Sequence, residues 1–206
     1  MISISDLSLD RTVYYSDAVI AIALTLLALG LPVPLGEDES EVWASFVENL
    51  SPDYLSFVIS FLVISAFWLS HHRFFQKMAR VSRRLMRWNL ISLFAIVLVP
   101  FATKVLTAHG EIAFGPVLYA GVMALFGLSY LFMVRVAGRD GLWREEVPAG
   151  FAADATAGMG TVFGVFVLSI PLAFVNPSLA QFSWLLMPVI AALLPKLRSR
   201  GLASQG

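Results

Sequence analysis

The most constraining feature of the sequence is a run of fourteen residues, Ala18 to Leu31, in which only Thr25 carries a polar side chain. Such a run, with its neighbours from Arg11 to Pro34, is typical of a helix inside a lipid bilayer. Ser16 and Asp17 come directly before it. A carboxylate at membrane depth costs about 2.5 to 3.5 kcal/mol on insertion scales, so Asp17 needs a partner or a function.

The composition of the whole chain indicates an integral membrane protein. Hydrophobic residues make up 58% and charged residues 14%, against about 45 to 50% and about 25% in soluble domains. The absence of cysteine excludes disulfides, thiol catalysis and cysteine metal clusters. We expect no cleavable signal peptide, because the N-terminus carries Asp6 and Asp10 instead of a basic leader.

Six apolar stretches are long enough to cross a hydrocarbon core of about 30 Å. They cover residues 12–33, 52–71, 86–107, 112–136, 156–176 and 180–195. The last stretch is short and contains Pro188. The sequence therefore predicts an all-α polytopic membrane protein, with six transmembrane helices forming one domain over residues 1–206.

Basic residues predict the orientation, because cytoplasmic loops near span ends collect lysine and arginine. Thirteen of the fourteen basic residues fall on one side, and only Lys104 falls on the other. They are Arg11, then Arg73, Lys77, Arg80, Arg83, Arg84 and Arg87, then Arg135, Arg139 and Arg144, then Lys196, Arg198 and Arg200. We therefore expect both termini in the cytoplasm and a multi-pass protein of the plasma membrane.

The first loop on the opposite side is acidic and contains no basic residue. Its acidic residues include Glu37, Asp38, Glu39 and Glu41. Acidic residues at a pore mouth would form a vestibule that concentrates cations, an effect that salt weakens. Alternatively, these residues only keep an outer loop soluble. Trp43 and Phe46 in the same loop indicate a short helix at the membrane interface.

A helical projection at about 100° per residue gives the first apolar stretch two faces. Leu26 and Leu29 both fall within about 40° of Ile22, whereas Asp17 lies about 140° from it. Either this stripe packs against a neighbouring helix while Asp17 faces water, or it lines a narrow space. Thr25 lies about 60° from Ile22 and either bonds back to its own helix or lines the same space.

Several polar residues are expected at one membrane depth near the cytoplasmic side. We expect a polar network that holds the first helix in a fixed rotation. Its candidate members are Arg11, Ser16, Asp17, Trp68, His71, His72 and Asn89. Adjacent histidines point about 100° apart on a helix, so only one of the two is expected to join. The alternative places both histidines at the lipid headgroups. No HExxH spacing exists, and no metal site is expected.

Three segments resemble the first half of a known family. Arg11 precedes Tyr15-Ser16-Asp17 by three intervening residues, Trp68 precedes His71-His72, and a third segment runs from Asn89-Leu90 to Pro100-Phe101. This pattern resembles the transmembrane protein 175 family, which comprises lysosomal potassium channels and their prokaryotic relatives. Tyr15 stands where the family usually has phenylalanine.

The resemblance implies a potassium-permeable cation channel, assembled as a homotetramer whose first helices line the pore. In that family an apolar constriction replaces a carbonyl filter, and by position it falls on Ile22, Leu26 and Leu29. The sequence also lacks the TVGYG filter of ordinary potassium channels. Expected partners are membrane lipids, monovalent cations and further copies of the chain, with no nucleic acid and no cofactor beyond permeant potassium.

Two other function classes compete with a channel. A proton-coupled or cation-coupled carrier would use an intramembrane Asp and His pair as a relay. A membrane scaffold would transport nothing. An enzyme is not expected and no catalytic residue is assigned, since the sequence has no P-loop, no GxGxxG after a strand and no Ser-His-Asp set assignable to one site.

Overall fold

The structure, a computed structural model, describes residues 4–185, and these fold into helices. The helices are α1 (Ile4–Ala28), α2 (Glu39–Asn49), a turn of π-helix (Leu50–Tyr54), α3 (Leu55–Gln76), α4 (Arg83–His109), α5 (Phe114–Arg139), α6 (Phe151–Val175) and α7 (Pro177–Trp184). Five of them, α1 and α3 to α6, are long and apolar enough to cross a membrane. The predicted all-α polytopic fold is confirmed.

The helix ends differ from the apolar stretches counted in the sequence. The first helix was expected at 12–33 but covers Ile4–Ala28, because its first turns are polar and its end is set by backbone turns before Pro32 and Pro34. The helix expected at 86–107 extends at both ends, to Arg83–His109, whereas the helix expected at 112–136 lies a few residues later, at Phe114–Arg139. Of the sixth expected span, 180–195, α7 covers the start, and residues 186–195 lie outside the described part.

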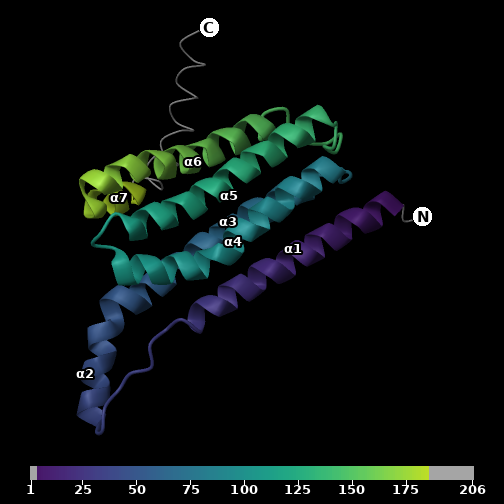
Figure 1. Cartoon of the computed structure of the whole chain (residues 1–206). Helices are drawn as coiled ribbons and strands as arrows, with labels where there is room; N and C mark the ends of the chain where they lie inside the picture. The colour runs from purple at the N-terminus through teal and green to yellow at the C-terminus, as the bar shows by residue number, and fades with distance from the viewer. Residues whose placement is uncertain (1–3, 186–206) are drawn as a thin grey trace.

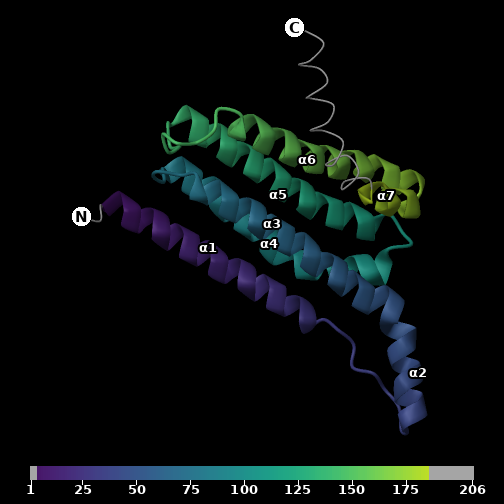
Figure 2. The same ribbon diagram turned by 180° about the vertical axis from the view of Figure 1, so that it is seen from behind.

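The long helices form a layered bundle (Figures 1 and 2). Helix α1 lies along one side, packed on α3 and α4, while α5 packs on α4 and α6 packs on α5. Helix α5 is the most enclosed of the five long helices, with 61% of its most apolar window buried. Gly127 lets α5 and α6 approach, since a Cβ atom there would lie 3.1 Å from Cβ of Phe163. The bundle therefore leaves α1 covered on one side only.

Helix α2 projects away from the bundle (Figure 1). It corresponds to the short helix expected around Trp43 and Phe46. The Phe46 ring lies 5.0 Å from the Tyr54 ring, and the Tyr54 hydroxyl donates to the carbonyl of Pro32 at 2.9 Å. These contacts hold the loop that follows α1 against the base of α3.

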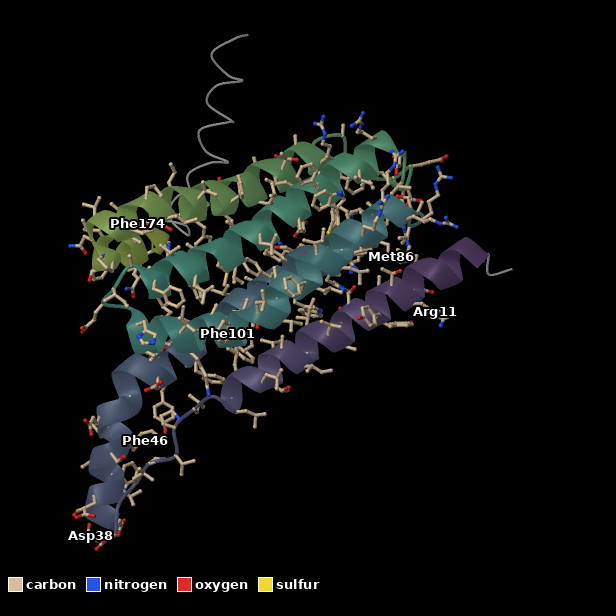
Figure 3. The ribbon with its side chains drawn as sticks, viewed as in Figure 1. Arg11, Asp38, Phe46, Met86, Phe101 and Phe174 are labelled. Atoms are coloured by element: carbon tan, nitrogen blue, oxygen red, sulfur yellow. The ribbon has the colours of Figure 1, made fainter. Side chains whose placement is uncertain are left out.

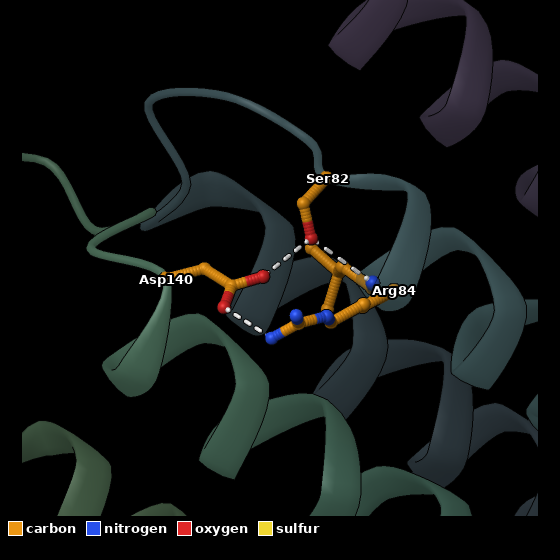
Figure 4. A network of polar contacts seen from close by, with 4 residues as sticks. Ser82, Arg84 and Asp140 are labelled. Atoms are coloured by element: carbon orange, nitrogen blue, oxygen red, sulfur yellow. Dashed lines mark hydrogen bonds and ion pairs between the residues drawn. The ribbon is translucent and has the colours of Figure 1, made fainter.

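Asp38 lies at the tip of α2 (Figure 3). At the opposite end of the bundle, near Arg11 and Met86, several side chains end in nitrogen atoms, drawn in blue. Figure 4 shows how two loops are joined at the basic end. Ser82, the N-cap of α4, donates to Asp140 at 3.0 Å, and Arg84 contacts the same carboxylate at 3.4 Å. The ends of α4 and α5 are thereby fixed to each other.

Candidate functional site

The candidate site is the uncovered face of α1. Ile22, Leu26 and Leu29 are 59%, 42% and 79% exposed, although all three are large apolar side chains. Thr25 is exposed on the same side, and its hydroxyl donates to the carbonyl of Ile22 at 2.8 Å. This back-bond satisfies the donor and leaves the hydroxyl oxygen with lone pairs on the open face.

The opposite face of α1 is packed. Ile20, Ala23 and Leu27 are buried in the core, and Leu24 is half-buried against it. Buried and exposed positions thus divide α1 along its length, as the helical projection requires. Ile22, Leu26 and Leu29 lie on the side of α1 that the described residues leave exposed, and Leu26 and Leu29 also line a pocket with Phe101 and Lys104 of α4.

A buried chain of hydrogen bonds anchors the N-terminal half of α1 to the bundle. Ser16 donates to the carbonyl of Thr12 at 2.8 Å, and the amide nitrogen of Asn89 donates to the Ser16 hydroxyl at 2.9 Å. The other end of the Asn89 amide lies 2.8 Å from Nε2 of His71. Because Asn89 Oδ1 can only accept, His71 Nε2 carries the proton. The chain therefore runs in one direction through α3, α4 and α1.

A second polar contact lies on the half-buried side of α1. The indole Nε1 of Trp68 donates to Asp17 Oδ1 at 2.8 Å. The Trp68 ring stacks on His72 with ring centroids 5.4 Å apart, and His72 in turn contacts Gln76 at 2.8 Å. Asp17 thus has a charge-assisted partner supplied by α3.

The structure brings the seven expected polar residues together unequally. Ser16, His71 and Asn89 share one set of hydrogen bonds, while Asp17, Trp68 and His72 share another. Arg11 is exposed and makes no hydrogen bond or ion pair with any residue in 4–185. The two histidines lie on different sides of α3, which is the separation that adjacent helical positions require.

The sequence reasoning missed a buried hydroxyl pair. Ser60 of α3 lies 2.8 Å from Thr103 of α4, and Thr103 donates to the carbonyl of Val99 at 2.8 Å. Since the Thr103 proton is used on its own helix, Ser60 donates across the interface. The only signal in the sequence was a serine and a threonine in two neighbouring apolar stretches. This pair fixes the α3–α4 contact in the half of the bundle nearer α2.

Glu37, Asp38, Glu39 and Glu41, at the start of α2, have unequal environments, although all are exposed. Asp38 is the N-cap of α2: its Oδ1 accepts from the Glu41 amide at 2.9 Å and from the Ser40 hydroxyl at 2.7 Å. These bonds hold the pKa of the Asp38 carboxyl below its usual value. Glu41 accepts from the amide of Glu37 at 2.8 Å. No described side chain binds the Glu37 and Glu39 carboxylates.

Metal chemistry receives no support from residues 4–185. No group of three or more His, Asp or Glu side chains in that range is placed to hold a metal ion. The site therefore consists of an apolar face, one hydroxyl and a buried polar anchor.

Comparison with known proteins places this geometry in context. The family model described as the endosomal/lysosomal potassium channel TMEM175 matches residues 11–100. A potassium channel of Streptomyces collinus is 32% identical over 178 residues, covering 82% of this chain and 84% of that protein. The zebrafish (Danio rerio) endosomal/lysosomal proton channel TMEM175 is 25% identical over 127 residues, which cover 62% of this chain but only 24% of that protein.

A solved structure agrees with these sequence matches. The crystal structure of a lysosomal potassium-selective channel TMEM175 homologue from Chamaesiphon minutus superposes with a TM-score of 0.75 at 26% identity. The match covers 90% of this chain and 96% of that one. The sequence resemblance is thus confirmed, and the chain belongs to the TMEM175 family.

Proposed function

We propose that this chain assembles as a homotetramer into a potassium-permeable cation channel of the plasma membrane, with α1 of each copy lining the pore. The observation that carries the proposal is the apolar face of α1 that the described residues leave exposed. Membership of the TMEM175 family supports a potassium channel, since the relatives from Streptomyces collinus and Chamaesiphon minutus are potassium channels.

In this proposal Ile22, Leu26 and Leu29 form the constriction. Their side chains are exposed and require cover that the described part of the chain does not supply. A ring of such side chains offers no oxygen to a cation, so an ion passes partly dehydrated or waits until the ring is wetted. Thr25 supplies the hydroxyl oxygen nearest to this ring.

The α1 helices are also shaped for close approach. Ala18 and Ala21 are exposed beside the stripe, and small residues let membrane helices pack closely. The hydrogen bonds at Ser16 and Asp17 hold α1 against α3 and α4, so its open face keeps one rotation. A fixed rotation is what an apolar ring of constant width requires.

The orientation follows from charge. We assign both termini and the basic end of the bundle to the cytoplasm, and residues 1–206 to one six-span domain. The acidic tip of α2 then lies outside, where Glu37, Asp38, Glu39 and Glu41 form a vestibule that attracts cations.

A coupled carrier is the second candidate, but the hydrogen bonds do not favour it. A relay requires proton exchange between Asp17 and a histidine, whereas Asp17 binds Trp68 and His71 binds Asn89. Neither histidine forms a hydrogen bond or ion pair with Asp17 within the described part.

Reconstitution tests the proposal. Purified protein in liposomes with opposed potassium and sodium gradients should show a reversal potential displaced toward that of potassium. Single-channel steps in planar bilayers should accompany it. Flux that saturates without resolvable steps, or that needs a proton gradient, would identify a carrier. No flux at all would leave the scaffold as the better description.

A further inference from the structure

A second feature lies on the far side of the bundle from α1. An open groove of about 1000 Å³ separates the cytoplasmic halves of α5 and α6. Its walls are mostly apolar, with Leu128, Leu131, Phe132 and Val134 from α5 and Ala153 and Ala157 from α6. It takes no part in the pore proposed above.

The groove exists because large and small residues face each other. Helix α6 contributes Ala152, Ala153, Thr156 and Ala157, which recur at helical spacing on one side. On α5, Phe132 is held by stacking on Trp88 of α4, with ring centroids 4.2 Å apart and planes 7° apart. Phe132 is therefore not available to swing across and fill the space. The groove is part of the packed fold.

One end of the groove is positively charged. Arg135 and Arg139 line it one helical turn apart, and both are exposed. Within residues 4–185 neither guanidinium has a hydrogen bond or an ion pair. By contrast, Arg84 binds Asp140, and Arg144 binds the carbonyl of Met78. Arg135 and Arg139 therefore offer unused donors beside an apolar channel.

The length of the groove identifies a ligand class. From Leu128 to Arg139 an α-helix rises about 16 Å, which is half of the hydrocarbon core of about 30 Å. The groove is apolar over the depth of one leaflet and carries two arginines at its end. A phospholipid with a negatively charged headgroup fits both features, because its acyl chain is apolar and its headgroup is anionic. Basic pockets between transmembrane helices favour such headgroups.

We propose that this groove binds an anionic phospholipid, with an acyl chain between α5 and α6 and the phosphate between Arg135 and Arg139. Planar guanidinium groups bind phosphate through paired N–H donors, which suits this end of the groove. The assignment of the headgroup to the cytoplasmic leaflet rests on the orientation proposed above. Binding itself does not depend on channel activity.

Native mass spectrometry of the purified assembly in detergent tests the proposal, with dioleoyl phosphatidylglycerol and dioleoyl phosphatidylcholine titrated separately. We expect the wild type to retain phosphatidylglycerol in preference to phosphatidylcholine. The double variant Arg135→Gln/Arg139→Gln should bind phosphatidylglycerol about 30-fold more weakly, because each basic residue contributes about 1 kcal/mol and 1.4 kcal/mol is a factor of ten.

A matched control comes from α4. Arg83 and Arg87 are also exposed, one turn apart and at the same end of the bundle, but they lie outside the groove. Arg83→Gln/Arg87→Gln should bind as the wild type does. Ala153→Leu keeps every charge yet narrows the groove, and it should weaken binding of the diacyl lipid.

Three outcomes would overturn the proposal. Equal retention of the two lipids by the wild type would remove headgroup selectivity. If the Arg83/Arg87 variant loses as much phosphatidylglycerol binding as the Arg135/Arg139 variant, the selectivity would come from general surface charge and not from the groove. A changed oligomer mass in the Arg135/Arg139 variant, with lipid binding intact, would make the groove a contact between copies. Potassium flux through liposomes is measured separately, so failure here leaves the channel proposal standing.

Discussion

Asn89 shows how one residue determines the position of a helix. It is buried, and its amide donates to Ser16 of α1 while it accepts from His71 of α3. Both ends of the amide are used, which is the condition under which a polar side chain at membrane depth is stabilising. Sequence reasoning selected these residues from their common depth and from the family motif. It had no means to choose between His71 and His72, because that choice depends on the rotation of α3.

The Asp17 contact yields a prediction. Asp17→Leu leaves the half-buried Trp68 indole without its acceptor, which should cost at most the about 1 to 3 kcal/mol of an unpaired buried group. Asp17→Asn keeps an oxygen in place and should cost less. Thermal unfolding of the purified assembly measures both. If the Leu variant keeps the oligomeric state, thermal stability and currents of the wild type, Asp17 has no anchoring role.

Asp38 gives a prediction about pH. Its folded-state pKa lies below the usual 3.8, since backbone and hydroxyl donors stabilise the carboxylate. A lowered pKa means that the cap stabilises α2 above the unfolded-state pKa, and that this contribution is lost as pH falls through the folded-state value. We therefore expect the start of α2 to fray below about pH 3.8.

The exchange rate of the Glu41 amide, measured by NMR, follows this change, because that amide donates to Asp38. Asp38→Asn retains a capping oxygen without a titrating group. In that variant, protection of the Glu41 amide should not change over the same pH range. Fraying at the same pH in both proteins would assign the effect to another acid.

At the scale of elements, α1 is defined by its two faces. The leucines at 24 and 27 pack into the bundle, while the stripe of Ile22, Leu26 and Leu29 does not. Periodicity in the sequence predicted which residues share a face. It could not show which face was covered, because that depends on where α3 and α4 lie. Likewise, counting apolar residues located the helices, but missed the polar first turns of α1 that begin at Ile4.

Substitutions on the two faces of α1 should affect different properties, ion permeation for the exposed face and stability for the packed face. Ile22→Ala should raise conductance and weaken discrimination between potassium and sodium, since a smaller ring lowers the barrier to passage. Leu26→Ala and Leu29→Ala should act in the same direction, but less. Reversal potentials under potassium and sodium gradients measure the ratio of permeabilities.

The leucines at 24 and 27 are the matched controls for the stripe. Leu27→Ala removes a buried side chain and should cost about 2 to 5 kcal/mol of stability. Its permeability ratio should stay that of the wild type, as should that of Leu24→Ala. Unchanged ratios in all three stripe variants, with altered ratios in these two, would place the pore on the other face.

For the whole molecule, charge is divided between two ends. A test of the acidic tip should spare Asp38 and Glu41, because their carboxylates also bind backbone amides. Glu37→Gln/Glu39→Gln removes two charges and none of those bonds. Inward cation current should fall more at 0.01 M than at 0.1 M salt, since the reach of a charge shortens from about 30 Å to about 10 Å. A reduction independent of salt would indicate a structural effect.

In the proposed assembly, neighbouring copies cover the exposed stripe, and the chain contains no cysteine to complicate a test. Two single-cysteine variants compare the faces of α1: position 29 lies on the open face and position 27 on the packed face. If copies of α1 surround a common axis, Leu29→Cys should give covalent two-chain products with a short bismaleimide reagent, the largest product that one thiol per chain permits. Leu27→Cys should remain a single chain, since its thiol lies within one bundle. The number of chains is read from the native mass of the assembly, and a mass of two chains would replace the tetramer with a dimer. Products from position 27 and none from position 29 would show that the apolar face meets lipid, and the pore would then have to be sought elsewhere in the bundle.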